Sequence, residues 1–216
     1  VLYQQQGQYQ KALSYYKDAL LVIGDDAEIY ERMADCCFAM NNKTDAAAFY
    51  DATLRMKPDG INAAVKLAQI YLENGDTDKA LNVLQIGLVS HPDVVEFSMA
   101  IGTIYKDMGE FERALAYFRK VVLLDEHNAE GFKQLGECCF ALDLFKQALP
   151  FYAASYKIIP DAGLLVKMGI IYEKQNKKVQ AAQMYEKWLE TQVFTISEQD
   201  YSEQQQFVRI NKFLAK

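Results

Sequence analysis

Four cysteines are the residues of this chain best suited by type to bind a metal ion or to act as nucleophiles. They form two adjacent pairs, Cys36-Cys37 and Cys138-Cys139. Neighbouring side chains on a helix point about 100° apart, so neither pair is arranged to form an internal disulfide or to hold one metal ion. The spaced C-x-x-C clusters that are typical of zinc sites are absent from the sequence. We therefore predict reduced, buried thiols that pack as small apolar side chains, which favours a reducing compartment.

No other set of side chains in the sequence has the spacing of a catalytic site. There is no glycine-rich phosphate loop, no H-E-x-x-H motif and no G-x-S-x-G motif. The carboxylates are numerous but scattered, which is typical of solvated helix surfaces. We interpret His91 and His127 as exposed turn residues and Trp188 as a core residue. The sequence therefore predicts that the chain is not an enzyme and that it uses no cofactor and no metal ion.

The charge balance argues against a nucleic-acid partner. The chain of 216 residues has 23 basic and 29 acidic side chains, a formal net charge of -6, whereas nucleic-acid binders usually have a basic excess. No apolar run approaches the roughly 20 residues that a membrane-spanning helix needs, so we expect no membrane insertion. The first residues, from Val1 to Gln4, do not resemble a signal peptide. Together with the cysteines, these observations predict an intracellular, cytoplasmic location.

The elements that must position the side chains are visible as a repeat. Alanines recur at an almost constant spacing, at Ala12, Ala46, Ala80, Ala114, Ala148 and Ala181. A large aromatic or aliphatic residue follows each alanine by four positions. An alanine or glycine precedes each by twelve positions wherever the chain extends that far. The tiny residue allows a second helix to approach closely, and we expect the large residues to fill the space between this hairpin and the next.

A turn residue completes each repeat. Five positions before the alanines lie Gly7, Asn41, Gly75, Gly109, Asp143 and Asn176. All of these residue types tolerate the left-handed backbone conformation in which helices often end. Three repeats also close with a proline, where a second helix must stop, at Pro58, Pro92 and Pro160. The pattern therefore predicts a series of helical hairpins.

These markers resemble those of the tetratricopeptide repeat (TPR) family, whose hairpins recur with a period of about 34 residues, as the alanines do here. The clearest example runs from Ile101-Gly102-Thr103-Ile104-Tyr105 through Gly109 and Ala114 to Phe118. The resemblance implies an all-α fold, a right-handed superhelical solenoid of about six helix-turn-helix units over residues 1–195. We place the units at 1–26, 27–60, 61–94, 95–128, 129–161 and 162–195. The first unit is incomplete, so we expect the chain to be a fragment of a longer array.

Two segments depart from the repeat. Pro150 falls two residues after Ala148, inside an expected second helix, where it predicts a kink or a late helix start. Residues 196–216 lack the repeat markers, and Ser197 and Asp200 resemble a capping box. We predict one long capping helix from about 198 to 214, which covers the last hairpin as terminal caps of repeat arrays do. The alternative is that this helix docks on a neighbouring molecule.

The resemblance also implies where a partner would bind. In the family the first helices line the concave side of the superhelix, so the register selects the inward-facing positions. The residues selected as partner-binding are Arg32, Asp35, Phe38, Lys66, Gln69, Leu72, Met99, Thr103, Lys106, Lys133, Glu137, Phe140, Lys167 and Ile170. Their mixed charges and apolar side chains are typical of a partner groove. The alternative is that Phe38 and Phe140 tuck between neighbouring first helices.

One known use of the family is disfavoured by this register. Co-chaperones of the family bind the C-terminal carboxylates of a chaperone tail through a lysine and an asparagine four residues later. In this chain Glu137 follows Lys133 at that spacing, and Asp35 follows Glu31. Acidic groups at these positions would repel a carboxylate tail.

We therefore expect a protein–protein interaction scaffold or adaptor that holds a helix or an extended peptide of a partner in the concave groove. Such a chain would be a segment of a larger protein in a multi-subunit assembly. One alternative is self-association, in which the open N-terminal end or the C-terminal helix packs on another copy. The other alternative is a regulatory or docking module of an enzyme encoded outside this segment.

Overall fold

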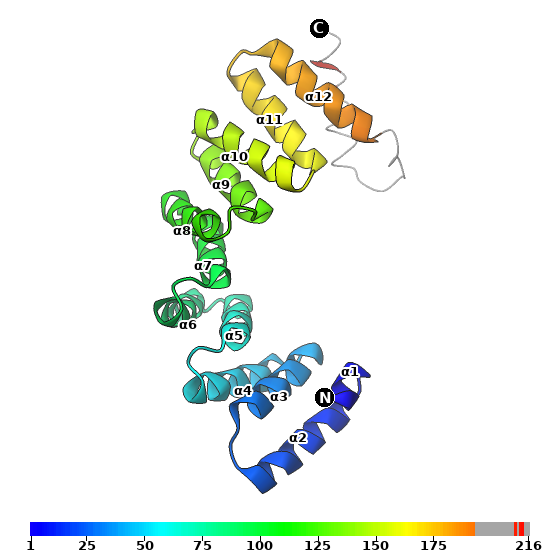
Figure 1. Ribbon diagram of the computed structural model, residues 1–216, viewed down its shortest axis with the longest axis vertical. Helices are drawn as coiled ribbons and strands as arrows, with labels where there is room; N and C mark the ends of the chain where they lie inside the picture. Colours follow the sequence, from blue (N-terminus) through cyan, green and yellow to red (C-terminus); the bar gives the residue numbers. More distant parts are fainter. Residues whose placement is uncertain (193–209, 211, 214–216) are drawn as a thin grey trace. The chain divides into compact units, whose positions relative to one another are not determined.

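Figure 1 shows the computed structural model of the chain, which describes residues 1–192, 210, 212 and 213. Regular structure in these residues is entirely α-helical. The helices are α1 (Leu2–Gln5), α2 (Tyr9–Ile23), α3 (Ala27–Ala39), α4 (Lys43–Met56), α5 (Ile61–Glu73), α6 (Thr77–Ser90), α7 (Val95–Asp107), α8 (Phe111–Leu124), α9 (Ala129–Ala141), α10 (Phe145–Ile158), α11 (Ala162–Lys174) and α12 (Lys178–Gln192). The predicted all-α repeat fold is confirmed.

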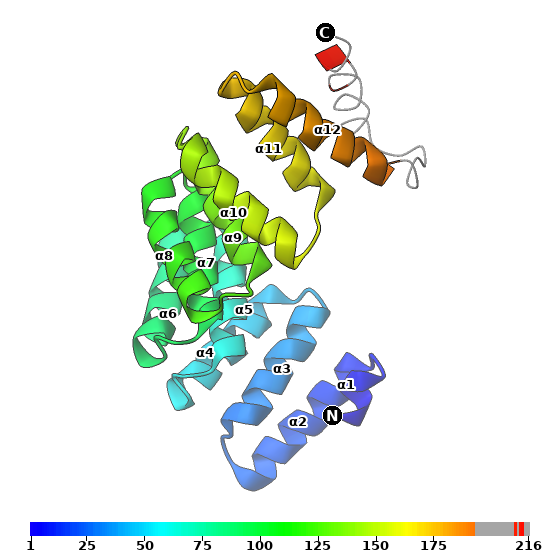
Figure 2. The same cartoon turned by 45° about the horizontal axis from the view of Figure 1, so that its top comes forward.

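The helices belong to two compact bodies, Val1–Leu124 and Asp125–Lys216. In the N-terminal body, α3 packs on α4, α5 on α6 and α7 on α8, and each second helix also packs on the following first helix (Figure 2). In the C-terminal body, α9 packs on α10 and α11 on α12, and α10 also packs on α11. Each body is thus a stack of hairpins, and we call α3, α5, α7, α9 and α11 the first helices.

Each hairpin turn contains one residue in the left-handed backbone conformation. These residues are Gly7, Asn41, Gly75, Gly109, Asp143 and Asn176. The three that are not glycine have φ between 56° and 59°, a region that side-chain-bearing residues other than asparagine and aspartate seldom enter. The predicted turn positions are therefore all confirmed.

The tiny residues of the first helices allow each hairpin to close. A Cβ atom added to Gly102 would lie 2.8 Å from the ring of Phe118, and one added to Gly136 would lie 2.6 Å from the ring of Tyr152. Both rings are fully buried. The large residue therefore packs on the glycine of its own hairpin. Leu84, which has this position in the hairpin α5–α6, also belongs to one apolar cluster with Phe97 and Ile101 of the next hairpin, as expected.

A different contact joins the hairpin α5–α6 to the hairpin α7–α8. The ring of Phe97 at the start of α7 is 0% exposed. A Cβ atom added to Gly87 of α6 would lie 2.5 Å from the Cζ atom of this ring. The aromatic side chain therefore occupies the space that the glycine of the preceding helix leaves empty.

All four cysteines are buried thiols. Cys36 and Cys37 lie in one apolar cluster with Met33 and Leu67. Burial raises the pKa of the Cys36 thiol to about 11, so this thiol is neutral near pH 7 and behaves as a small apolar side chain. The predicted packing role of the cysteines is confirmed.

Pro150 is the sixth residue of α10, so the helix begins before the proline and continues past it. The expected late helix start is therefore wrong. Proline has no backbone N–H group, so the carbonyl oxygen of Lys146 lacks the helical hydrogen bond that it would otherwise accept.

The predicted capping helix lies mostly outside the described residues. Ile210, Lys212 and Phe213 are described, and all three are helical. Ile210 is buried, and the ring of Phe213 meets the ring of Tyr185 of α12 edge-on, with centroids 5.4 Å apart. The contact of Phe213 brings an apolar side chain of the tail onto the last hairpin, while the extent of the capping helix stays a prediction. Trp188 of α12 is buried, as predicted.

Candidate functional site

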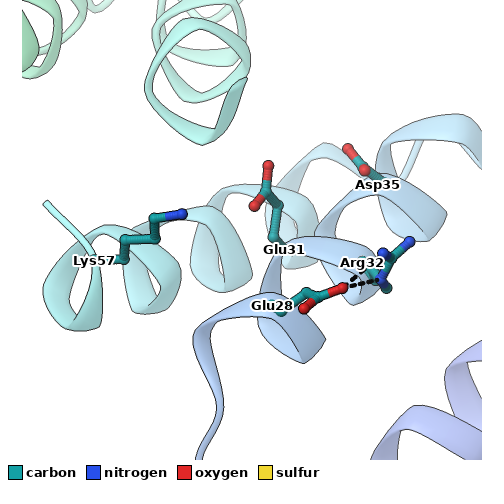
Figure 3. A pocket seen from close by; sticks show the side chains of 5 residues that line it. All are labelled: Glu28, Glu31, Arg32, Asp35 and Lys57. Carbon is teal, nitrogen blue, oxygen red and sulfur yellow. Dashed lines mark hydrogen bonds and ion pairs between the residues drawn. The ribbon is translucent and has the colours of Figure 1, made fainter. Parts of the chain in front are cut away.

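The exposed side of α3 carries a polar pocket of about 350 Å³ (Figure 3). Glu28, Glu31, Arg32 and Asp35 line it from successive turns of α3, and Lys57 lines it from the end of α4. Spacings of three and four residues place these α3 side chains on one face of the helix. Arg32 donates hydrogen bonds to Glu28, with Nη2 2.7 Å from Oε1, and these bonds raise the pKa of the guanidinium group. Three carboxylates against two cations leave this pocket net negative.

Between α3 and α5, the side chain of Lys66 covers an aromatic ring of the preceding first helix. The Nζ atom of Lys66 lies 4.7 Å from the ring centroid of Phe38 and 3.8 Å from Oδ1 of Asp35. Tyr50 of α4 donates a hydrogen bond of 2.6 Å to the same oxygen. Phe38 is half-buried beneath this lysine. This arrangement favours the alternative in which Phe38 tucks between neighbouring first helices.

A second contact joins this hairpin to the next one near the hairpin turns. Lys43, the first residue of α4, forms an ion pair of 2.6 Å with Glu73, the last residue of α5. Gln69 donates a hydrogen bond of 3.1 Å to the other oxygen of that carboxylate. Lys43 and, to a smaller extent, Gln69 lower the pKa of Glu73. Negative charge is unfavourable at a helix C-terminus, and Lys43 offsets it here.

Between α5 and α7, both cations are missing from the equivalent positions, and a pocket of about 490 Å³ lies there. Ala100 occupies in its repeat the position that Lys66 has in the preceding one, and Thr77 corresponds to Lys43 in the same way. The apolar part of the pocket lining consists of Val65, Ala68, Leu72, Leu84, Ala100, Ile104 and Met108.

Polar side chains line the rest of this pocket. They are Gln69, Thr77, Thr103 and Asp107. Asp107 is the last residue of α7 and occupies the position that Glu73 has on α5. No hydrogen bond or ion pair joins its carboxylate to a described residue. The pocket therefore combines an apolar interior with one uncompensated negative charge.

In the C-terminal body, lysine side chains form contacts at the same two places between the hairpins α9–α10 and α11–α12. The Nζ atom of Lys167 lies 3.0 Å from Oε2 of Glu137 and 5.5 Å from the ring centroid of Phe140. The Nζ atom of Lys174, the last residue of α11, lies 4.9 Å from the ring centroid of Phe145 at the start of α10. The second pair thus joins the same two positions as Lys43 and Glu73, with a cation–π contact in place of an ion pair.

Lys133 is held by its own chain. Its Nζ atom donates a hydrogen bond of 3.0 Å to Oδ2 of Asp161, which raises the pKa of the lysine. Asp161 is also the N-cap of α11 and accepts a hydrogen bond of 2.9 Å from the backbone N–H of Gly163. A lysine that already forms this ion pair is poorly placed to bind the carboxylate of a partner's tail.

The structure places the fourteen predicted partner-binding residues on the two bodies, which are described separately. In the N-terminal body, Arg32 and Asp35 line the polar pocket, Phe38 and Lys66 cover each other, and Gln69, Leu72 and Thr103 line the apolar pocket. Met99 and Lys106 are half-buried on α7 and belong to neither pocket lining. In the C-terminal body, Lys133, Glu137, Phe140 and Lys167 are engaged with one another or with Asp161, and Ile170 is half-buried on α11.

Several residues of the apolar pocket lie outside the predicted partner-binding set, among them Thr77, Leu84, Ala100 and Met108. A signal for two of them was present in the sequence. A comparison of equivalent positions in successive repeats shows alanine in the place of Lys66 and threonine in the place of Lys43. These two differences indicate a pocket only when it is known that Lys66 and Lys43 contact the neighbouring hairpin in the structure.

The described residues contain no group of three or more histidine, cysteine or acidic side chains that could hold a metal ion. Among the described helices, none has the length and apolar character to cross a membrane. His91 follows α6, with Nε2 3.6 Å from Oδ2 of Asp59, and His127 is exposed.

Two family models described as tetratricopeptide repeat match the chain, one at residues 3–59 and 44–102 and the other at residues 95–128. Together they cover more than half of the 216 residues.

Among curated relatives, Protein CTR9 homolog of Arabidopsis thaliana is 35% identical over 88 residues, which are 38% of this chain and 8% of that protein. Protein O-mannosyl-transferase TMTC1 of Homo sapiens is 20% identical over 183 residues, which are 83% of this chain and 21% of that protein. The chain therefore spans less than a quarter of the length of either relative.

Among solved structures, YrrB is described as a TPR protein with an unusual peptide-binding site. It superposes with a TM-score of 0.69 at 22% identity, covering 84% of this chain and 94% of that chain. At this identity the likeness shows the fold alone.

Proposed function

Because the chain belongs to the tetratricopeptide repeat family, we propose that it is a non-catalytic scaffold that binds a helix or an extended peptide of a partner protein. The proposed site is the first-helix face of the N-terminal body, meaning the exposed side of α3, α5 and α7. Family members generally serve as scaffolds for protein partners, and the chain would act as one segment of a larger, multi-subunit assembly.

The observation that carries this proposal is the apolar pocket between α5 and α7. Its volume of about 490 Å³ is in the range of about 300–1,000 Å³ typical of ligand pockets. Leu72 at this pocket is 39% exposed and stands among charged and polar groups. An apolar recess with a polar surround is the usual setting of an interface anchor. The peptide-binding site described for YrrB, which has the same fold, agrees with this proposal.

Self-association is a second candidate function, and one observation favours it. Leu21, Val22 and Ile23 end α2 and form three consecutive exposed aliphatic side chains. A second copy of the chain could bury them. The third candidate, a docking module of an enzyme, is supported by the similarity to the O-mannosyl-transferase TMTC1, of which the chain spans only 21%.

Site-specific photo-crosslinking tests the proposed face. A photoreactive amino acid is introduced at Gln69 on the first-helix face or, as a control, at Val89 on α6, which is 83% exposed. We expect crosslinks to a partner protein from position 69 that are lost when Leu72→Glu is added. Crosslinks from position 89 alone would move the site to the second helices.

Sedimentation separates this proposal from self-association. A chain that is monomeric at all concentrations tested would remove the second candidate. If it is dimeric, the double substitution Leu21→Glu and Val22→Glu should make it monomeric, while the crosslinks from position 69 to a partner persist. Crosslinks from position 69 only to a second copy of the chain would contradict the scaffold proposal.

A further inference from the structure

The contacts between consecutive first helices can be compared within this chain. We call the space between two such helices a step, closed where a lysine of the later helix covers a phenylalanine of the earlier one and open where these side chains are missing. Two steps, from α3 to α5 and from α9 to α11, each place a lysine of the later first helix over a phenylalanine of the earlier one. In both steps, that lysine also faces a carboxylate. The step from α5 to α7 has Gln69, Leu72 and Ala100 at these three positions. The open step therefore lacks the cation, the aromatic ring and the carboxylate that close the other two steps.

The missing side chains leave apolar surface that nothing in the described part of the N-terminal body covers. Leu72 and Met108 are both exposed. Leu84, which is fully buried, reaches the pocket from α6, so the recess extends down to the second helix. Removing apolar surface of this kind from water is favourable, so a recess of this size and lining fits an aliphatic or aromatic side chain.

The negative charge of Asp107 at the pocket indicates which group of a partner should lie next to the apolar side chain that enters the pocket. Asp107 is the last residue of α7, where the helix dipole already places partial negative charge. Between α3 and α5, Glu73 has the position equivalent to Asp107, and Lys43 neutralises it at a distance of 2.6 Å. At the pocket between α5 and α7, the position of Lys43 is occupied by the neutral Thr77. Lys106 is next to Asp107 in sequence but points about 100° away around the helix. The carboxylate of Asp107 therefore lacks the cation that its position favours.

Two further carboxylates of the same face have no cationic partner among the described residues. Glu31 on α3 accepts its hydrogen bond from the neutral amide of Asn62, at 2.7 Å. Glu96 lies in the first turn of α7. The charges that the first-helix face leaves uncompensated are thus mainly negative, and complementary partners are positive.

We propose that the pocket between α5 and α7 binds a partner segment in which an aliphatic or aromatic residue is flanked by lysine or arginine. The apolar side chain enters the recess beside Leu72 and Leu84. The basic group supplies to Asp107 the cation that Lys43 supplies to Glu73. This inference rests on the proposed binding function of the first-helix face and specifies the chemistry of its partner.

Direct binding of short peptides tests the proposal with the complete chain. The probe is fluorescein-labelled Gly-Ser-Lys-Phe-Arg-Ser-Gly, and binding is followed by fluorescence anisotropy. One matched peptide has alanine in place of phenylalanine, and another has glutamate in place of both basic residues. We expect the alanine peptide to bind at least about tenfold more weakly, as for the loss of an anchor. The acidic peptide should bind more weakly still, and added salt should weaken the binding of the basic peptide.

Substitutions in the chain locate the binding. Ala100→Lys introduces the residue found at the equivalent position of the preceding repeat, so it is compatible with the fold, and it should reduce binding at least about tenfold by filling the recess and repelling the basic groups. Asn82→Lys adds the same charge on an exposed position of α6 outside the pocket lining and should leave the affinity unchanged within about twofold. Asp107→Asn should weaken the basic peptide about two- to fivefold and leave the acidic peptide no weaker.

Three results would overturn the proposal: equal or tighter binding of the acidic peptide, unchanged binding by Ala100→Lys, or no binding of the basic peptide up to about 1 mM, a weak affinity for any specific site. Crosslinks from position 69 to a partner in the presence of any of these results would leave the scaffold function intact and reject only the partner chemistry. Absence of those crosslinks would reject the scaffold function itself.

Discussion

The contact between Gly87 and Phe97 should couple two consecutive hairpins energetically. A Cβ atom at position 87 would lie 2.5 Å from the ring of Phe97, which is fully buried. The equivalent pair one step earlier is Thr53 and Ala63, both also fully buried. Between α6 and α7 the small residue lies on the second helix and the large one on the following first helix, whereas between α4 and α5 the larger residue is on the second helix. We therefore predict that Gly87 and Phe97 can be replaced together by threonine and alanine.

We predict the stability of a double-mutant cycle built on this exchange. Phe97→Ala should cost about 3–5 kcal/mol because it leaves a cavity in the core. Gly87→Thr should cost about 1–3 kcal/mol in the wild-type background because it overpacks the site. The double mutant recreates the pair that occurs between α4 and α5, so threonine fills part of the cavity. Gly87→Thr should then be neutral or stabilising in the Phe97→Ala background, which corresponds to a coupling of at least about 1–3 kcal/mol.

Urea unfolding of the wild type, the two single mutants and the double mutant measures this coupling. The m-value of each protein needs to be compared, because an array of repeats can lose two-state cooperativity when one interface weakens. Gly109→Ala, placed in a hairpin turn away from the pair, should cost the same in both backgrounds and is the matched control. If Gly87→Thr costs the same with phenylalanine as with alanine at position 97, the packing argument is refuted.

Three further predictions follow from single sites. Gly109 has φ of +79° and open space around the added Cβ atom, so Gly109→Ala should cost about 1–2 kcal/mol through backbone strain alone, measured by urea unfolding, and Gly109→Asn should cost less. Cys36 and Cys37 should resist an aromatic disulfide reagent at pH 8 until urea unfolds the chain, and fast labelling of the native protein would contradict their burial. Burial opposes ionisation of Asp161, but hydrogen bonds from Lys133 and a backbone N–H outweigh it and lower the pKa of Asp161. Because the folded-state pKa lies below the unfolded-state value of about 3.9, the stabilisation is present above that pH and is lost as pH falls through the folded-state pKa. Asp161→Asn should therefore reduce the loss of stability on acidification below about pH 4, and an unchanged dependence in pH-resolved unfolding would contradict the assignment.

The hairpins, their turns and their close approach could be read from the sequence because each depends on a local steric requirement. Asn41, Asp143 and Asn176 were identified as turn residues because few residue types accept a positive φ. Gly102 and Gly136 were identified because two helices can approach closely only over a tiny side chain. Because these steric requirements recur in every repeat, the residue range of each hairpin could be predicted without knowledge of the neighbouring hairpins.

The candidate site depended on contacts between hairpins, which register alone does not determine. The register predicts that Phe38 and Phe140 face a partner groove, yet each is covered by a lysine of the next first helix. Leu72 has the same register but no lysine above it, because position 100 is alanine. Whether the side chain at this register position is covered by the chain itself therefore depends on a residue of the next first helix.

By itself, the sequence determined that this chain folds as stacked helical hairpins, because the repeat depends on backbone conformation and side-chain volume within a single hairpin. The tertiary structure decided which parts of the first-helix face are already occupied by the chain's own cations. These ion pairs and cation–π contacts form only where two side chains from different hairpins come within a few ångströms of each other. The step from α5 to α7 is open because neither Ala100 nor Thr77 can form that contact.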